Sequence, residues 1–76
     1  MLTKAEYRFL KTIGENVRKH RVQNDISQSQ LAFEINTSLR QVQRIEKGEA
    51  NASIIYYYRI AEVLNIPFEN FFKNIK

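Results

Sequence analysis

Residues 27–47 read SQSQLAFEINTSLRQVQRIEK, and this stretch decides the fold that we expect. A helix-start signal opens it at Ser27 and recurs at Ser38, because each serine is followed three residues later by a glutamine, as in a capping box. Between the two signals lies Asn36, a residue type that tolerates a positive φ in a tight turn. The pattern therefore predicts a helix of about two turns, a short turn, and a second helix over about residues 39–47.

The apolar side chains of this stretch are spaced to hold the two helices against each other. Leu31, Ala32 and Ile35 give the first helix a short inward face, and Val42 and Ile45 mark the inward side of the second. The small alanine lets the helices approach closely, and the later aliphatic residues pin the second helix across the first. These features together predict a helix-turn-helix.

Helical patterns also flank this motif on both sides. A capping box at Thr3 starts a helix near residue 4 that is expected to run to about Asn24. Ser53 caps a fourth helix that Asn65 closes, and a last helix is expected after Pro67. No segment alternates in the manner of a strand, so the predicted fold class is all-α, a compact five-helix domain in which helices 2 and 3 form the helix-turn-helix.

Length and charge limit the organisation of the chain. Its 76 residues contain no long linker, so we expect a single domain over residues 1–76. Twelve Lys and Arg exceed eight Asp and Glu, and the net charge of +4 suits a polyanionic partner such as nucleic acid. The chain has no cysteine and no apolar run of about 20 residues, so we expect a cytoplasmic protein without a membrane segment.

Catalytic and metal-binding patterns are missing from the sequence. The one histidine, His20, has no cysteine or acidic motif at catalytic spacing and cannot make a metal site alone. The glycines at 14 and 48 are too far apart to form a phosphate-cradling loop. We therefore expect neither an enzyme nor a bound metal or cofactor, and His20 is either a half-buried core residue or a titrating group.

The outward face of the predicted helix 39–47 is rich in hydrogen-bond donors. With Val42 and Ile45 turned inward, the opposite face and leading end present Leu39, Arg40, Gln43, Arg44 and Lys47. Arginine binds guanine in a bidentate fork, glutamine does the same to adenine, and leucine contacts the thymine methyl group. This chemistry favours readout of the major groove, although any amphipathic helix has a polar solvated face.

The segment 13–72 resembles the Cro/phage-repressor type of helix-turn-helix domain, also called the xenobiotic-response-element family of bacterial regulators. The matching words are NVRKHR, ISQSQLA, RQVQRIEKGEAN and YRIAEVLNIP, in the order and spacing of the family. The resemblance implies a lambda-repressor-like fold and sequence-specific binding of double-stranded DNA by a standalone transcriptional regulator. An alternative is a protein-interaction module, such as an antitoxin-like partner, that keeps the fold with little or no DNA binding.

The resemblance also implies roles for individual residues. Base edges would be read by Leu39, Arg40, Gln41 and Arg44. Phosphates would be bound at the start of the second helix and around the third, by Ser27, Gln28, Ser38, Gln43 and Lys47, since a helix start favours an anion. A structural ion pair would join Arg21 to Glu46.

Apolar residues near the chain end leave two interpretations open. Ile55, Tyr56, Phe68, Phe71 and Phe72 form either part of an enlarged core or a surface for a partner. Family members often pair in this region across a two-fold axis, and half-sites one DNA turn apart require such a dimer. The resemblance therefore implies a homodimer on a palindromic operator, and the chain has no room for a small-molecule effector domain.

Overall fold

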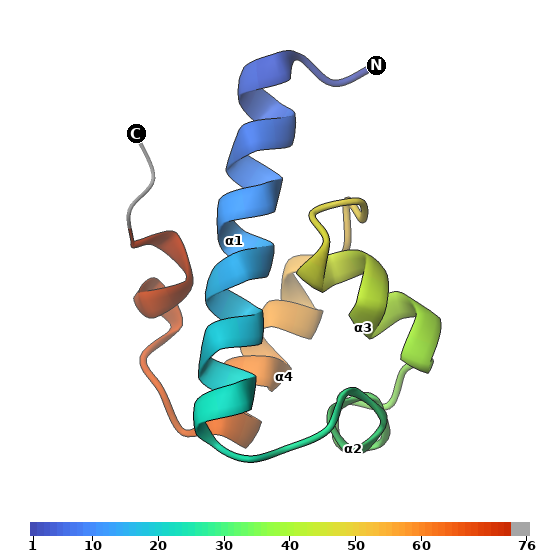
Figure 1. Cartoon of the computed structure of the whole chain (residues 1–76), viewed down its shortest axis with the longest axis vertical. Coiled ribbons are helices and arrows are strands. Elements are labelled where there is room, and N and C mark those ends of the chain that lie inside the picture. Colours follow the sequence, from blue (N-terminus) through green and yellow to red (C-terminus); the bar gives the residue numbers. More distant parts are fainter. Residues whose placement is uncertain (74–76) are drawn as a thin grey trace.

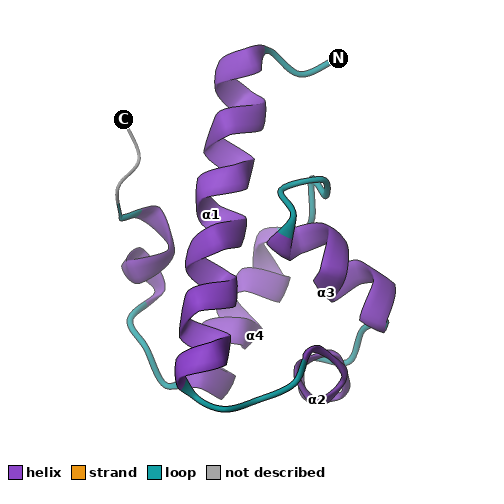
Figure 2. Ribbon diagram, in the orientation of Figure 1, coloured by secondary structure: helices purple, strands orange, loops and turns teal. Residues whose placement is uncertain are grey.

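The structure, a computed structural model that describes residues 1–73, contains four α-helices and one short 3-10 helix. The elements in chain order are α1 (Lys4–Gln23), α2 (Gln28–Glu34), α3 (Leu39–Glu46), α4 (Ile54–Leu64) and η1 (Phe68–Phe72). Residues 1–73 contain no strand (Figure 2), which confirms the all-α prediction for that part of the chain. The last three residues of the expected domain lie outside the described residues. No helix in the described part is long and apolar enough to cross a membrane.

The prediction of a fifth α-helix was wrong. The segment after Pro67 is a single 3-10 turn, Phe68–Phe72, and Lys73 already has an extended backbone. No side chain caps its start, and five residues are too few to nucleate an α-helix without help from packing. What fixes this segment is its tertiary contact with α1: the buried Asn16 donates from Nδ2 to the carbonyls of Phe71 and Lys73, at 2.8 and 2.9 Å.

The long helix α1 organises the rest of the molecule (Figure 1). α3 lies on one side of it, η1 lies on the other side, and α4 lies behind it in this view. α2 follows a short loop after α1, lies below α3 in this view, and packs mainly against α3. The core between these elements is built from fully buried side chains contributed by every helix, the largest being Val17, Leu31, Ile35, Val42, Ile45, Ile60, Leu64 and Phe71.

Local sequence signals set most of the boundaries. Thr3 and Glu6 form the reciprocal capping box that starts α1. Ser27 and Ser38 cap α2 and α3 by accepting from the backbone N–H three residues later, but the reciprocal half of the predicted box is missing. At α2, for example, Gln30 donates to Glu34 within the helix instead.

Left-handed residues close the turns as the sequence predicts. Asp25, Asn36 and Asn65 all have φ between 55° and 59°. Asn36 turns the chain between α2 and α3, and Asn65 is the C-cap of α4. Asn and Asp accept this conformation at lower cost than other residues with a Cβ, so the turns stay short without glycine.

Glycine is required where α1 meets α3. A Cβ at Gly14 would collide with the carbonyl of Ile45 and lie 2.7 Å from that of Glu46. Gly48, at φ 74°, follows α3, and a Cβ there would lie 2.5 Å from the Lys11 Cα. Both glycines therefore let the backbones of α1 and α3 approach closely, which fixes the direction in which α3 leaves the body of the protein.

Candidate nucleic-acid interface

The α3 helix has one buried face and one exposed polar face. Val42 and Ile45 are buried in the core, as the sequence predicts. Five of the residues expected at the groove are exposed here: Leu39, Arg40, Gln43, Arg44 and the C-cap residue Lys47. Gln41 is half-buried, so it lies at the edge of this face rather than at its centre. The structure thus brings three of the four predicted base readers onto one exposed surface.

The charged side chains on this face are weakly tied to the protein. Arg44 donates from Nη2 to the carbonyl of Glu49 at 3.4 Å, which is at the long end of hydrogen-bond distances. Arg40 and Lys47 form no ion pair within residues 1–73. Their donors are therefore available to an acceptor outside the chain.

The serines predicted at the phosphates lie at the starts of α2 and α3. Ser27 Oγ accepts from the Gln30 N–H at 3.0 Å, and Ser38 Oγ accepts from the Gln41 N–H at 3.1 Å. Both side chains are exposed. Because a hydroxyl accepts and donates at the same time, each serine keeps an O–H donor for an anion while it caps its helix.

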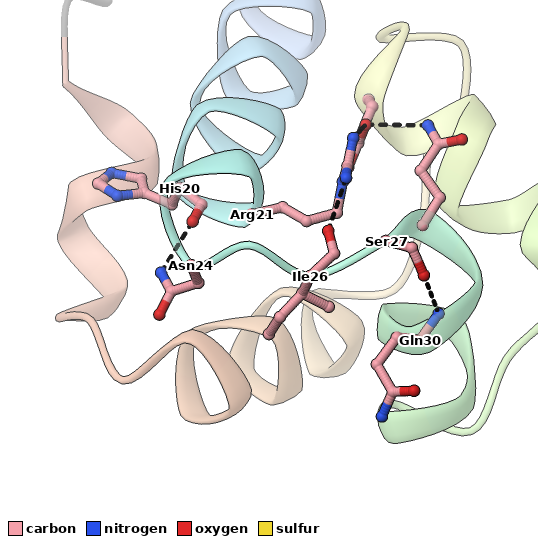
Figure 3. A network of polar contacts seen from close by, with 8 residues as sticks. His20, Arg21, Asn24, Ile26, Ser27 and Gln30 are labelled. Atoms are coloured by element: carbon pink, nitrogen blue, oxygen red, sulfur yellow. Dashed lines mark hydrogen bonds and ion pairs between the residues drawn. The ribbon is translucent and has the colours of Figure 1, made fainter.

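A polar network joins α1, α2 and α3 beneath this face (Figure 3). Arg21 Nε donates to Glu46 Oε2 at 2.6 Å, Arg21 Nη2 donates to Glu46 Oε1 at 3.2 Å, and Arg21 Nη1 donates to the Ile26 carbonyl at 2.7 Å. Glu46 is 6% exposed, so the pair implied by the family resemblance is present and largely buried. The fork of the guanidinium fixes the turn before α2 and the end of α3 at once.

Gln28 also belongs to this network. The family resemblance implies only a contact with a phosphate for this residue. Its Nε2 donates to Glu46 Oε1 at 3.0 Å, and its side chain is half-buried. One amide donor of Gln28 is thus committed to the protein, and it ties the start of α2 to the end of α3. Sequence gave no signal for this contact, since the two residues are 18 positions apart.

The aromatic residues at the chain end divide between core and surface. Phe71 is 0% exposed, so its assignment to a dimer interface is corrected: its side chain fills the core against His20 and Phe68. Phe72 is 37% exposed and stacks on Phe9 with ring centroids 6.3 Å apart. Phe71 faces inward because the Asn16 hydrogen bonds fix the turn around it.

Of the α4 residues expected at an interface, Ile55 is exposed, whereas Tyr56 is half-buried with the Arg59 guanidinium 5.7 Å from its ring centroid. Two further residues were missed: Ile54 and Tyr58 are 69% and 53% exposed. Ile54 has the spacing of an inward residue, three positions before the buried Tyr57, but it is the first residue of α4 and its side chain is largely exposed. A hollow of about 320 Å³ is lined by Ile54, Ile55, Tyr58 and Phe68.

His20 is a half-buried residue next to the core. Its ring meets the Phe71 ring edge-on at 6.4 Å between centroids. Burial lowers the pKa of His20 below the usual 6.5, and the nearby Lys19 and Lys73 charges lower it further. The described residues contain no cluster of His, Cys, Asp and Glu suited to a metal ion.

Comparisons with known proteins agree with this geometry. The helix-turn-helix family model HTH_3 matches residues 17–71. A Rhodospirillum rubrum protein named as an uncharacterized transcriptional regulator in the ATPase CF(0) region is 33% identical over 64 residues, covering 84% of this chain. This chain spans 59% of the length of that relative.

Solved structures show the same fold. The restriction-modification controller protein C.AhdI from Aeromonas hydrophila superposes with a TM-score of 0.79 at 28% identity, over 83% of this chain and 96% of that one. An HTH_3 family transcriptional regulator from Vibrio cholerae superposes with a TM-score of 0.80 at 26% identity, over 91% of this chain and 39% of that one. The chain belongs to the HTH_3 helix-turn-helix family, of the Cro/C1 type.

Proposed function

We propose that this protein binds double-stranded DNA sequence-specifically, with α3 in the major groove, and thereby regulates transcription. The observation that carries the proposal is the exposed face of α3, where two guanidinium groups and an amide lie opposite the buried Val42 and Ile45. Arg40 and Arg44 are suited to guanine and Leu39 to a thymine methyl group. Gln41 would join them from the edge of the groove.

Phosphate contacts would fix the register of α3 on the duplex without reading sequence. The exposed hydroxyls of Ser27 and Ser38, the Gln43 amide and the Lys47 ammonium provide donors around the groove. Gln28 would contribute in a different way, because its side chain holds α2 against Glu46 and so sets the position of Ser27. The net charge of +4 supports attraction to the DNA backbone.

The proposal includes a homodimer on a palindromic operator. Two copies of α3 would read half-sites about 34 Å apart, which requires a two-fold contact between the chains. The exposed apolar surface formed by Ile54, Ile55, Tyr58 and Phe68 supports such a contact, because its hollow is shallow and lined by apolar side chains. Phe72 borders this surface because its ring packs against that of Phe68, with centroids 5.3 Å apart, whereas Phe71 is fully buried.

Control of transcription would follow from operator occupancy. The similar proteins reported above are named as transcriptional regulators or as a restriction-modification controller. A dimer whose affinity depends on protein concentration would respond to the amount of the protein itself, by mass action. We therefore propose that it occupies its operator and there blocks or recruits polymerase.

A fluorescence titration with a generic labelled duplex at low and high salt tests the proposal. The logarithm of the affinity should fall linearly with the logarithm of the salt concentration, with a slope of about −0.9 per phosphate neutralised. A protein that shows no binding even at low salt would contradict the proposal and favour the interaction-module alternative.

Sedimentation across a protein concentration series tests the homodimer separately. We expect a monomer–dimer equilibrium that shifts to the dimer on DNA containing paired half-sites. An Ile55→Lys variant should weaken the dimer, because it places two like charges near the two-fold axis, while a Phe33→Lys variant at an exposed position of α2 should not. A strict monomer on such DNA would contradict the paired half-site model.

A further inference from the structure

The helix α1 carries a row of basic side chains that lies outside α3. Lys4, Lys11 and Arg18 are spaced by seven residues, so successive members are only about 20° apart around the helix axis. All three are exposed, and none forms an ion pair within residues 1–73. Glu6, the acidic residue of the first turn, is engaged in the capping box with Thr3.

This row lies beside the contact between α1 and α3. Gly14 and Arg21 mark the line along which α1 touches α3, and Lys11 lies about 60° from Gly14 around the axis. Ile13 and Val17 pack into the core on the other side of that line. The row is therefore turned away from the core and next to the exposed face that leads to Lys47.

The connection between α3 and α4 places the row next to the C-terminal end of the exposed face of α3. Gly48 directly follows Lys47, and its backbone lies against that of Lys11. Figure 1 shows this connection beside α1, with α1 continuing past it and the N-terminus turned toward the side of α3. Lys4 lies two turns beyond Lys11, about 10 Å further along the helix.

We propose that Lys4 and Lys11 bind DNA phosphates just outside the segment read by α3, so that α1 extends the contact beyond the helix-turn-helix. This inference rests on the proposed DNA binding and adds a second, sequence-independent surface to it. Lys4 and Lys11 are about 10 Å apart along α1, which exceeds the 3.4 Å of duplex axis that each phosphate of one strand occupies. The two side chains can therefore reach different phosphates.

The test compares two variants with the same change in charge. The Lys4→Gln/Lys11→Gln protein removes the proposed contacts. The Lys19→Gln/Lys73→Gln protein is the matched control, because both of its lysines lie near His20, on the side of α1 that faces η1. The probe is a labelled duplex that carries a site selected from a random pool by the wild-type protein, with about one helical turn, some 10 base pairs, of extra DNA on each side. Circular dichroism confirms that both variants are folded.

We expect the salt slope of the first variant to become shallower than that of the control by about 1.8 per protomer. The difference should vanish when the flanking DNA is trimmed away, because the phosphates in question are then missing. Equal slopes for the two variants on the long duplex, with intact wild-type binding, would overturn this inference and leave the proposed function standing. Failure of the wild type to bind any duplex would overturn the proposed function itself.

Discussion

The helix-turn-helix and the C-terminal part of the molecule differ in the contacts that hold them and in the side chains that they expose. α2 and α3 are held from within by a polar network of Arg21, Glu46 and Gln28, and α3 exposes arginines. η1 is held by the Asn16 hydrogen bonds to its backbone and by the buried ring of Phe71, and the surface that it forms with α4 is apolar.

This difference shows how different contacts can hold two parts of a small chain. A buried bidentate ion pair fixes direction better than aliphatic packing does, and direction matters for a helix that must enter a groove. A segment of only five residues cannot be fixed by its own backbone hydrogen bonds, so η1 depends on the Asn16 amide and on the large buried ring of Phe71. Under the proposed function, the polar surface would meet DNA and the apolar surface would meet a second copy.

The largest expected effect comes from removing the ring that holds the C-terminal part. Phe71→Ala should lower the free energy of unfolding by about 3–5 kcal/mol, since the side chain is fully buried and leaves a cavity. Phe72→Ala is the matched control one position along, and it should cost about 1 kcal/mol or less because that ring is partly exposed. Urea denaturation measures both. Equal losses would show that the two rings do not divide between core and surface as described.

Breaking the ion pair tests the other side of the comparison. Glu46→Ala should cost about 3 kcal/mol, because it leaves the Arg21 charge buried without its partner. Glu34→Ala, at an exposed helical glutamate, should change the stability by less than about 0.5 kcal/mol. Urea denaturation of the two variants measures both losses of stability. A neutral effect at Glu46 would mean that the network does not hold the helix-turn-helix.

A smaller loss is expected at the link between α1 and η1. Asn16→Ala leaves the carbonyls of Phe71 and Lys73 without their donor and should cost about 1–3 kcal/mol. Asn24 also donates to a backbone carbonyl, that of His20, but it is exposed, so water replaces its bond and Asn24→Ala should cost less. If the two substitutions cost the same, burial of the Asn16 amide has no special role.

The parts of the fold that sequence predicts are those fixed by neighbouring residues. Ser27 and Ser38 mark helix starts and Asn36 marks the turn between them, because a capping hydroxyl or a left-handed residue acts within three or four positions. The inward positions of Val42 and Ile45 follow from a period of 3.6 residues. The exposed face of α3, and with it the candidate site, could therefore be predicted.

The features that sequence did not predict depend on distant contacts. Phe71 is buried because Asn16, 55 positions away, binds its carbonyl. The role of Gln28 depends on Glu46, 18 positions away. Ile54 has the spacing of a core residue but is exposed at the first position of α4. In each case the environment of the residue depends on how its helix is placed in the fold, which the local sequence pattern does not specify.

The smallest effect expected is a dependence of stability on pH through His20. Its pKa is lowered in the folded state by burial and by Lys19 and Lys73, so the unfolded chain binds more protons near and below pH 6.5. The stability from this residue is complete above pH 6.5 and decreases as the pH falls through the folded pKa. Denaturation of wild type and His20→Gln from pH 7.5 to 5 measures it. If the free energy of unfolding of the wild type falls no more steeply with decreasing pH than that of the variant, the lowered pKa of His20 is contradicted.

The central claim is that the exposed face of α3 reads DNA sequence, and titration of Arg44→Ala on two duplexes tests it most directly. One duplex carries the site selected from a random pool and the other a scrambled sequence, with Gln43→Ala as the control for a phosphate contact. We expect Arg44→Ala to lose about 1–3 kcal/mol on the selected site and much less on the scrambled one, whereas Gln43→Ala loses similar amounts on both. Equal losses by Arg44→Ala on the two duplexes would contradict the claim.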